Sequence, residues 1–398
     1  MSLLDCIADP LCWEKFYGYK VANHFPDRLA GSLREFIDSR EYLTVYEQIK
    51  SGNGFPLPRK AVISKMSTQK KRTVYTYPRN ENLVMKLLTH LMLRRYDHLF
   101  APDLYSFRPS KTVKDAICSL THIQDMDKMY AYKVDISNYF NSIPVERLIP
   151  ILEDALEDDP ELFAFLRNLL EEPCVLDDGK PVEELKGIMA GTPNASFYAN
   201  LYLRELDQHF HDEGITYCRY SDDIIVFADS CVKVEEYASY IRSFLESKGL
   251  SVNPAKESFF TPEEGWVFLG FSYIQGKIDV APASVRKIKA KMRRKMRALK
   301  RWEKRNGKTP ESSAKAFIRI FNRKLFEKRD DNDLTWSLWY FPVINTVESL
   351  EAIDHYAQDC IRFLLTDKHT KGRFNVRYDD LKSLGYKSLV HEYYDLKK

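Results

Sequence analysis

The sequence lacks the patterns of a secreted, zinc-binding or membrane protein. Its seven cysteines are scattered and odd in number, and none forms a C-x-x-C pair with a nearby histidine. We therefore expect reduced thiols and no zinc site. No apolar run approaches the roughly 20 residues that span a bilayer, and the N-terminus has no basic stretch followed by an apolar core. These absences predict a cytoplasmic protein with no membrane partner.

Internal repeats and low-complexity linkers are also missing. The chain has 398 residues, of which 44% are hydrophobic, and this length predicts two or three domains with a large core. Its 23 Phe, 24 Tyr and 5 Trp exclude a disordered chain, because that many aromatic side chains must be buried.

Charge is unevenly distributed, although the formal net charge is only +3. The stretch 153–184 holds twelve Asp or Glu residues and only two basic residues. The stretch 286–305 holds twelve Lys or Arg residues and a single acid, Glu303. Such a concentration of positive charge is typical of a surface that binds a phosphate backbone.

Apolar spacing predicts an α+β fold. Strands are expected at 61–63, 73–77, 129–134, 215–220, 224–228, 257–260, 266–273 and 277–280. Helices are expected at 81–98, 144–170, 195–211 and 233–248, and through most of the chain after 282. A small antiparallel sheet would then carry acids at its strand ends, with helices behind it and a helical region after it.

Three aspartates stand at the ends of these predicted strands. Asp222 and Asp223 lie in a tight hairpin, where aspartate is common for purely structural reasons. Asp135 ends another strand, so two neighbouring strands would bring the three carboxylates together. Clustered carboxylates repel one another unless cations neutralise them, and oxygen ligands suit Mg²⁺. Two Mg²⁺ ions roughly 4 Å apart would support an in-line phosphoryl displacement.

Six motifs in order, between about 59 and 280, resemble those of bacterial reverse transcriptases, the family of group II intron, retron, diversity-generating and defence-associated enzymes. They are Phe-Arg-Pro (107–109), Val-Asp-Ile-Ser-Asn-Tyr-Phe (134–140), Lys-Gly-Ile-Met-Ala-Gly (186–191) with Ala-Asn-Leu-Tyr-Leu (199–203), Arg-Tyr-Ser-Asp-Asp (219–223), Lys-Gly-Leu with Asn-Pro-Ala-Lys (248–256) and Phe-Leu-Gly-Phe (268–271). The resemblance implies a right-hand polymerase. Residues 1–58 would be an N-terminal helical extension and 59–128 the fingers. Residues 129–280 would be the palm, with an acidic helical insertion at about 144–185, and 281–398 the basic helical thumb and C-terminal extension.

The resemblance also implies a catalytic centre. Asp135 and Asp222 would be the main ligands of two Mg²⁺ ions, with Mn²⁺ as an alternative, and Asp223 would assist. The backbone carbonyl of Ile136 would also contact a metal. Lys256 matches a lysine proposed to donate a proton to pyrophosphate, although a surface lysine after a turn fits the sequence equally well.

Nucleotide-binding residues follow from the same resemblance. Lys65 and Arg72 would hold the dNTP triphosphate, or form a solvated basic loop. Phe140 occupies the steric-gate position, which would exclude a ribose 2′-hydroxyl, unless it simply packs in the core. Many family members carry Pro-Gln-Gly where this chain has Met189-Ala190-Gly191, so the glutamine that positions nucleotide and template base is absent. We therefore expect unusual base selection, templating or processivity.

Template and primer contacts are expected in three places. Arg108 would brace either the fingers or the template. Phe268, Leu269 and Gly270 would form the primer grip, or belong to a core strand with a glycine kink. Arg293, Arg294 and Lys295 belong to a basic amphipathic helix that would lie along the template–primer duplex. The tail from Leu384 to Tyr394 resembles stand-alone, defence-type enzymes and would either bind structured RNA or cap the thumb.

The expected function is RNA-directed DNA synthesis in antiphage defence, with a dedicated noncoding RNA as template and dNTPs as substrates. No HNH endonuclease pattern, RNase H acid set or zinc-binding tail supports an autonomous mobile-intron enzyme. Alternatives are a retron or intron-type enzyme, a template-independent polymerase, and a non-catalytic RNA-binding protein on a polymerase scaffold. The sequence leaves the oligomeric state and the priming mode open.

Overall fold

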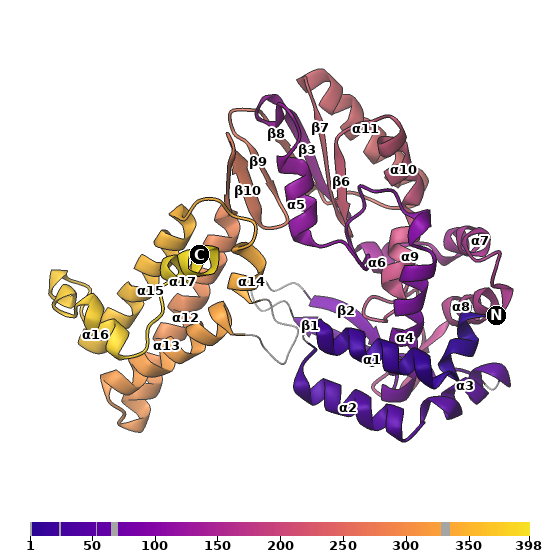
Figure 1. The fold of residues 1–398 in the computed structure, drawn as a ribbon, viewed down its shortest axis with the longest axis horizontal. Coiled ribbons are helices and arrows are strands. Elements are labelled where there is room, and N and C mark those ends of the chain that lie inside the picture. The colour runs from indigo at the N-terminus through magenta and orange to yellow at the C-terminus, as the bar shows by residue number, and fades with distance from the viewer. Residues whose placement is uncertain (1, 24, 53, 65–70, 328–334) are drawn as a thin grey trace. The chain divides into compact units, whose positions relative to one another are not determined.

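The chain folds into two compact units, Met1–Thr261 and Pro262–Lys398 (Figure 1). The computed structural model describes residues 2–23, 25–52, 54–64, 71–327 and 335–398. Within these ranges, no helix is both long enough and apolar enough to cross a membrane. The predicted α+β class is confirmed, with antiparallel sheets and a helical C-terminal region.

The first unit begins with helices that pack on one another. These are α1 (Pro10–Ala22), α2 (Asp27–Asp38), α3 (Tyr42–Lys50) and, after a strand pair, α4 (Arg79–Arg95). The Asp9 side chain accepts from the backbone N–H of Leu11 and so caps the start of α1. Trp13 is fully buried and stacks on Tyr42, with 5.2 Å between the ring centroids. Its indole nitrogen donates to the carbonyl of Ile7 at 2.8 Å, so the ring is buried without an unpaired donor.

One sheet of this unit joins segments far apart in sequence. Its strand order is β2-β1-β4-β5, formed by β1 (Arg59–Ser64), β2 (Lys71–Thr76), β4 (Cys174–Asp177) and β5 (Lys180–Glu183). The helical prediction for 144–185 holds for α7 (Val145–Ala155) and α8 (Pro160–Glu171) but is wrong for β4 and β5. The helical prediction fails at β4 and β5 because a two-residue hairpin turn joins these strands. Asp178 and Gly179 both adopt positive φ, 47° and 81°, as an Asp-Gly turn favours.

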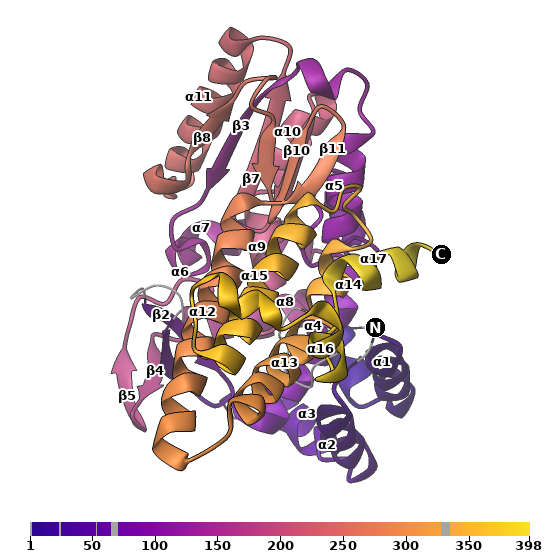
Figure 2. The ribbon, with the colours of Figure 1, turned by 90° about the vertical axis from the view of Figure 1, so that its left-hand side faces the viewer.

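A second sheet carries the predicted acids. Its order is β6-β7-β3-β8, formed by β3 (Tyr130–Asp135), β6 (Tyr217–Tyr220), β7 (Asp223–Ala228) and β8 (Ser258–Phe260), and every pair is antiparallel. Helix α11 (Cys231–Ser247) packs against β3 and β7 (Figure 2). The apolar side chains of Val134, Ile224 and Val226 are fully buried, which fixes the register of the sheet.

The remaining helices of the first unit are α5 (Val113–Thr121), α6 (Tyr139–Ser142), α9 (Ala195–Tyr202) and α10 (Arg204–Asp212). The sequence predicted a single helix at 195–211, and this was wrong. Leu203 leaves the helical conformation, with φ −109° and ψ 15°, and separates α9 from α10.

The second unit combines a small sheet with a helical bundle. Its strands are β9 (Trp266–Phe268), β10 (Phe271–Ile274) and β11 (Lys277–Val280). Its helices are α12 (Pro282–Asn306), α13 (Pro310–Phe326), α14 (Trp336–Tyr340), α15 (Glu348–Thr366), α16 (Tyr378–Ser383) and α17 (Leu389–Lys397). The strand predicted at 266–273 is in fact two strands, because Leu269 and Gly270 form a turn with φ of 49° and 88°.

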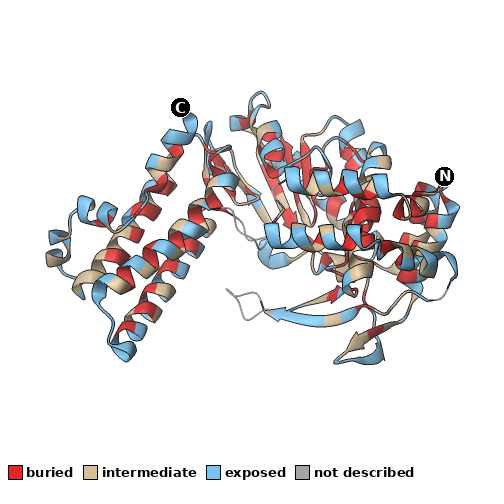
Figure 3. Cartoon of the chain, turned by 60° about the horizontal axis from the view of Figure 1, so that its bottom comes forward, coloured by how far each residue is buried: buried red, intermediate tan, exposed pale blue. Residues whose placement is uncertain are grey.

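Helices α12, α13 and α15 pack on one another, and their buried residues lie on the inner faces of the bundle (Figure 3). The C-terminal tail is fastened to this bundle by Asp354. Its carboxylate accepts hydrogen bonds from the hydroxyls of Tyr386 (2.8 Å) and Ser388 (2.6 Å) and from the backbone N–H of Leu389 (2.9 Å). These contacts match the capping alternative for the tail.

Candidate active site

The β6–β7 hairpin and β3 bring the predicted aspartates to one end of the sheet. Tyr220 pairs with Asp223, so Ser221 and Asp222 form the turn. Asp135 lies directly opposite Asp223 in the register, and the N–H of Ile136 donates to the carbonyl of Asp222 at 3.0 Å. Ordinary strand pairing therefore produces the juxtaposition that the sequence predicted.

Two of the three carboxylates at this end are paired with lysines. The ammonium of Lys256 contacts Asp135, whose side chain is 6% exposed. Lys133 approaches Asp223 at 3.9 Å. Across the described part of the chain, no three Asp, Glu, His or Cys side chains converge closely enough to enclose a metal ion.

Burial raises the pKa values of two of these acids. The pKa of Asp222 is raised by burial and then by the charge of Asp135. The pKa of Asp223 is raised to about 6, again mainly by burial, with further contributions from Asp222 and Asp135 and an opposing one from Lys133. Carboxylates that are costly to ionise and repel one another favour the binding of a divalent cation.

A cavity of about 440 Å³ opens beside these acids. It is lined by Asp135, Ile136, Phe140 and Asp222, with Arg72 and Lys256 among its cations. Phe140 is half-buried and meets Phe107 edge to face, with 6.3 Å between the ring centroids. The cavity thus offers acids, cations and an aromatic ring together, which is a suitable lining for a nucleotide. Lys65, predicted beside Arg72, lies outside the described residues.

The segment that replaces Pro-Gln-Gly acts here through its backbone. The N–H of Ala190 donates to the side-chain oxygen of Asn141 at 3.1 Å, and the Ala190 carbonyl accepts from the N–H of Tyr75 at 2.8 Å. Gly191 adopts φ of +105°, and a Cβ there would lie 2.9 Å from the carbonyl oxygen of Tyr75. This close approach to β2 requires glycine. A nucleotide-binding role for Ala190 and Gly191 stays a prediction.

A buried ion pair supports the hairpin from behind. The guanidinium of Arg219 binds Asp207 through two hydrogen bonds of 2.7 and 2.5 Å, and neither side chain is exposed. Arg219 also donates to the carbonyl of Ser221 in the turn, at 3.3 Å. The hydroxyl of Tyr217 gives Asp207 a third donor at 2.9 Å. The turn that carries Asp222 therefore rests on a fully hydrogen-bonded charge network.

The predicted nucleic-acid residues lie in different settings. Arg108 forms a bidentate pair with Asp97, at 2.7 and 2.8 Å, so its guanidinium braces its own unit. In the second unit, Phe268 is buried at the end of β9, and Leu269 and Gly270 form the turn that follows. On α12, the first of the three predicted basic residues, Arg293, donates to the hydroxyl of Tyr356 at 3.0 Å. Nucleic-acid contact by these residues stays a prediction.

Sequence reasoning missed Lys133, Asp207 and the role of Arg219. Lys133 was detectable, because it lies two residues before Asp135 and so points to the same face of the strand. Asp207 gave no signal, since an acid on an amphipathic helix is usually solvated and its burial depends on a partner from β6.

Comparison with known proteins identifies the family. Residues 63–273 match the family described as "Reverse transcriptase (RNA-dependent DNA polymerase)", which is more than half of the chain. The chain therefore belongs to the reverse transcriptase family. The match begins in β1 and ends in β10, so it includes the three aspartates and the cavity beside them.

Individual relatives are distant. The chain is 27% identical over 189 residues to an uncharacterized 91 kDa protein in the cob intron of Schizosaccharomyces pombe, covering 46% of this chain and 22% of that protein. It is 28% identical over 106 residues to the retron Ec86 reverse transcriptase of Escherichia coli, covering 26% of this chain and 33% of that protein. The matches thus span a third or less of these curated relatives.

Among solved structures, two telomerases are similar at 11% identity. The apo telomerase of Candida tropicalis has a TM-score of 0.45 and covers 62% of this chain and 60% of its own. The telomerase of Candida albicans, solved with a TWJ fragment of telomeric RNA, has a TM-score of 0.44 and covers 86% and 66%.

Proposed function

We propose that this chain is an RNA-directed DNA polymerase whose reaction centre is the cavity beside Asp135 and Asp222. The observation that carries the proposal is the pairing of Asp135 with Asp223 across β3 and β7, which places a third acid, Asp222, at the tip of the same sheet end. Membership of the reverse transcriptase family supports the reaction class.

Two Mg²⁺ ions, or Mn²⁺, are the cofactors proposed for this site. The side chains of Asp135, Asp222 and Asp223 and the carbonyl of Ile136 offer oxygen donors only, which are the ligands of a hard divalent cation. Burial raises the pKa values of Asp222 and Asp223, so a cation bound beside them would favour their ionised forms. When bound, the two ions would activate a primer 3′-hydroxyl and stabilise the departing pyrophosphate.

Lys256 is proposed to be the proton donor of the reaction. Its ammonium forms an ion pair with the carboxylate of Asp135. Because Lys256 also lines the cavity, its ammonium could donate a proton to the leaving pyrophosphate if Asp135 held a metal ion. Arg72, which also lines the cavity, would hold the triphosphate through charge-assisted hydrogen bonds.

Primer extension tests the polymerase proposal. The full chain is incubated with an RNA template, a complementary DNA primer, dNTPs and Mg²⁺, and the products are sequenced. We expect the primer to be extended with the complement of the RNA. Equal extension without the RNA template would favour template-independent addition, and no extension with any template would contradict the proposal.

Replacing Phe140 with Ala is expected to admit ribonucleotides. The ring lines the cavity, and its removal would relieve a clash with the ribose 2′-hydroxyl. We expect incorporation of rNTPs relative to dNTPs to rise roughly tenfold or more. Competitive primer extension measures this ratio. The matched control is Phe107→Ala, which removes the neighbouring ring that does not line the cavity. An unchanged ratio in Phe140→Ala would leave the ring with a packing role only.

Mg²⁺ is expected to stabilise the protein in a pH-dependent way. Metal binding requires ionised carboxylates, and the pKa of Asp223 is raised to about 6. Without metal, this acid favours folding most when protonated, so that contribution is lost as the pH rises through about 6. The increase in melting temperature caused by Mg²⁺ should therefore be full at neutral pH and shrink below about 6. An increase that does not change with pH would argue against these acids as ligands.

We also propose that the template is a dedicated noncoding RNA and that the enzyme serves antiphage defence. Support comes from the tail after Leu384, which resembles stand-alone defence-type enzymes, and from the basic helix α12, with Arg294 and Lys295 as proposed duplex contacts. Sequencing the RNA and DNA that copurify with the chain would reveal the template. Deleting the locus should raise phage plaquing, and unchanged plaquing across a broad phage panel would contradict the defence role.

A further inference from the structure

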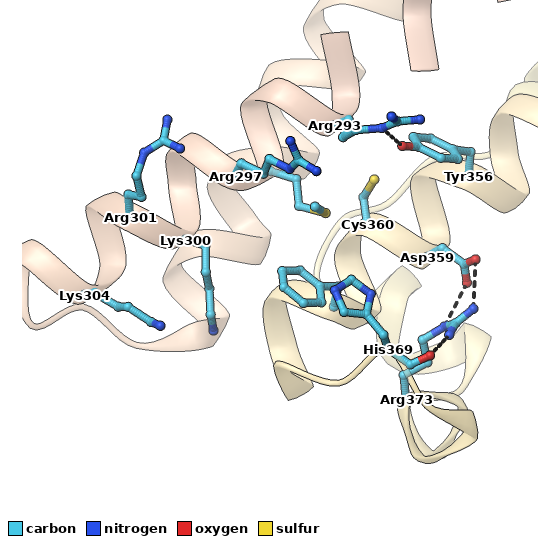
Figure 4. A pocket seen from close by; sticks show the side chains of 12 residues that line it. Arg293, Arg297, Lys300, Arg301, Lys304, Tyr356, Asp359, Cys360, His369 and Arg373 are labelled. Carbon is cyan, nitrogen blue, oxygen red and sulfur yellow. Dashed lines mark hydrogen bonds and ion pairs between the residues drawn. The ribbon is translucent and has the colours of Figure 1, made fainter. Parts of the chain in front are cut away.

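The second unit contains a cationic cavity of about 530 Å³ between α12 and α15 (Figure 4). Part of its lining is apolar, from Met296, Cys360 and Phe363. Met296 and Cys360 are nearly fully buried, so this part of the cavity is a fixed surface of the bundle. Arg297 extends from α12 toward Cys360 on the opposite helix (Figure 4). A cavity with both apolar and strongly basic walls suits a ligand with an apolar body and negative charge.

Most of the positive charge comes from one face of α12. Five basic residues of this helix line the cavity at spacings of four, three, one and three residues: Arg293, Arg297, Lys300, Arg301 and Lys304. Residues three and four apart are neighbours on a helix surface, where like charges repel one another. Arg373 adds a sixth cation, whereas Asp359 is the single acid among the lining residues.

Only part of this charge is neutralised within the unit. Lys300 pairs with Glu303 at 2.8 Å and with Asp367 at 3.7 Å. Arg373 pairs with Asp359 at 3.2 Å. In the described portion of the chain, the side chains of Arg297, Arg301 and Lys304 form no ion pair or hydrogen bond. Three unpaired cations bordering one cavity are better stabilised by an anion than by water alone.

An aromatic pair stands at the edge of the same cavity. His369 is exposed and stacks on Phe363, with 4.3 Å between the ring centroids and 21° between the ring planes. A planar ring held in this way is a stacking platform for a nucleobase, because every base presents a π-face. An inorganic anion would need the cations but not this platform.

We propose that this cavity binds one unpaired nucleotide, with its base on the His369–Phe363 pair and its phosphate on Arg297, Arg301 and Lys304. The nucleotide can belong to a single-stranded segment of nucleic acid or be a free nucleotide, since both present the same base and phosphate. The site does not depend on the polymerase reaction, so it stands apart from the proposed function.

Two charge-reversal variants of the full chain test the phosphate contacts. The first is Arg297→Glu with Arg301→Glu, and the matched control is Arg286→Glu with Lys287→Glu, which makes the same charge change on α12 outside the cavity. The probe is a fluorescein-labelled oligoadenylate RNA, followed by fluorescence anisotropy at fixed salt. We expect the first variant to bind roughly tenfold more weakly, and the control to lose much less. Equal losses would show that only the total charge of the helix matters, and would overturn the proposal.

His369→Ala tests the base contact. Loss of one stacking partner is expected to weaken oligoadenylate binding roughly fivefold or more. An abasic oligonucleotide of the same length should bind wild type and His369→Ala equally. Equal binding of the oligoadenylate itself by both proteins would overturn the nucleotide assignment.

Competition for the probe then distinguishes a free nucleotide from a single-stranded segment as the ligand. Displacement of the probe by AMP or ATP identifies a free nucleotide as sufficient, whereas displacement only by longer strands identifies a single-stranded segment, and either result supports the site. The Asp222→Asn variant should bind the probe like wild type. If primer extension contradicted the polymerase proposal, the binding expected at this cavity would therefore be unaffected.

Discussion

Replacing Asp222 with Asn is expected to reduce DNA synthesis at least roughly a thousandfold. An Asn side chain has nearly the same shape but one negative charge fewer, so the variant weakens the binding of both proposed metal ions. Metal ions contribute several kcal/mol of charge stabilisation in phosphoryl transfer, and each 1.4 kcal/mol corresponds to about tenfold in rate. Primer extension under single-turnover conditions would measure the loss.

The melting temperature of Asp222→Asn distinguishes the loss of a metal ligand from a loss of folding. Burial raises the pKa of Asp222, so its ionised form opposes folding when no metal is bound. Asp222→Asn should therefore melt at the same temperature as the metal-free wild type or higher, while the increase caused by Mg²⁺ is lost. Asp229→Asn is the matched control, because this exposed acid follows the same β7 strand and forms an ion pair with Lys233 at 2.9 Å. Full synthesis by Asp222→Asn would rule out the carboxylate as an essential ligand.

The pairing of acids was predictable because it depends on local patterns. The apolar runs around Asp135 and Asp223 define two strands, and a two-residue turn brings Asp222 to the tip. The strands at 174–183 were missed because each has only four residues and β5 is exposed throughout, so neither shows a clear alternation of apolar and polar residues. The break at Leu203 has no comparable signal, since the residue is a good helix former and its conformation is set by tertiary packing.

The support behind the site was not predictable from one sequence. Arg219 belongs to a recognised motif, yet its partner Asp207 is twelve residues away on a helix, and any of the neighbouring acids was an equally plausible choice. The contact made by Lys256 was also not predictable from the sequence. The family resemblance implies a role with pyrophosphate for Lys256, whereas its contact with Asp135 requires the turn after Asn253 to lie against β3. Long-range pairs of this kind depend on the assembled fold.

Arg219→Met is expected to destabilise the first unit by roughly 3–5 kcal/mol, because it leaves the carboxylate of Asp207 buried without its cation. Burial already raises the pKa of Asp207, and Arg219 opposes that shift, so removing the guanidinium leaves the burial cost uncompensated. Chemical denaturation would measure the free energy of unfolding. Arg34→Met is the control: it breaks partly exposed pairs with Glu14 and Asp38, both at 2.8 Å, each of which should contribute less than about 1 kcal/mol.

The double variant Arg219→Met with Asp207→Leu separates the two sources of this cost. If the unpaired charge is responsible, removing both partners should restore most of the lost stability, since apolar side chains of similar size can replace a buried pair. DNA synthesis should remain impaired in the double variant, because the hydrogen bond from Arg219 to the carbonyl of Ser221 is still missing from the turn that carries Asp222. Recovery of both stability and synthesis would mean that packing alone holds the hairpin. Recovery of stability without synthesis would show that Arg219 positions the catalytic turn.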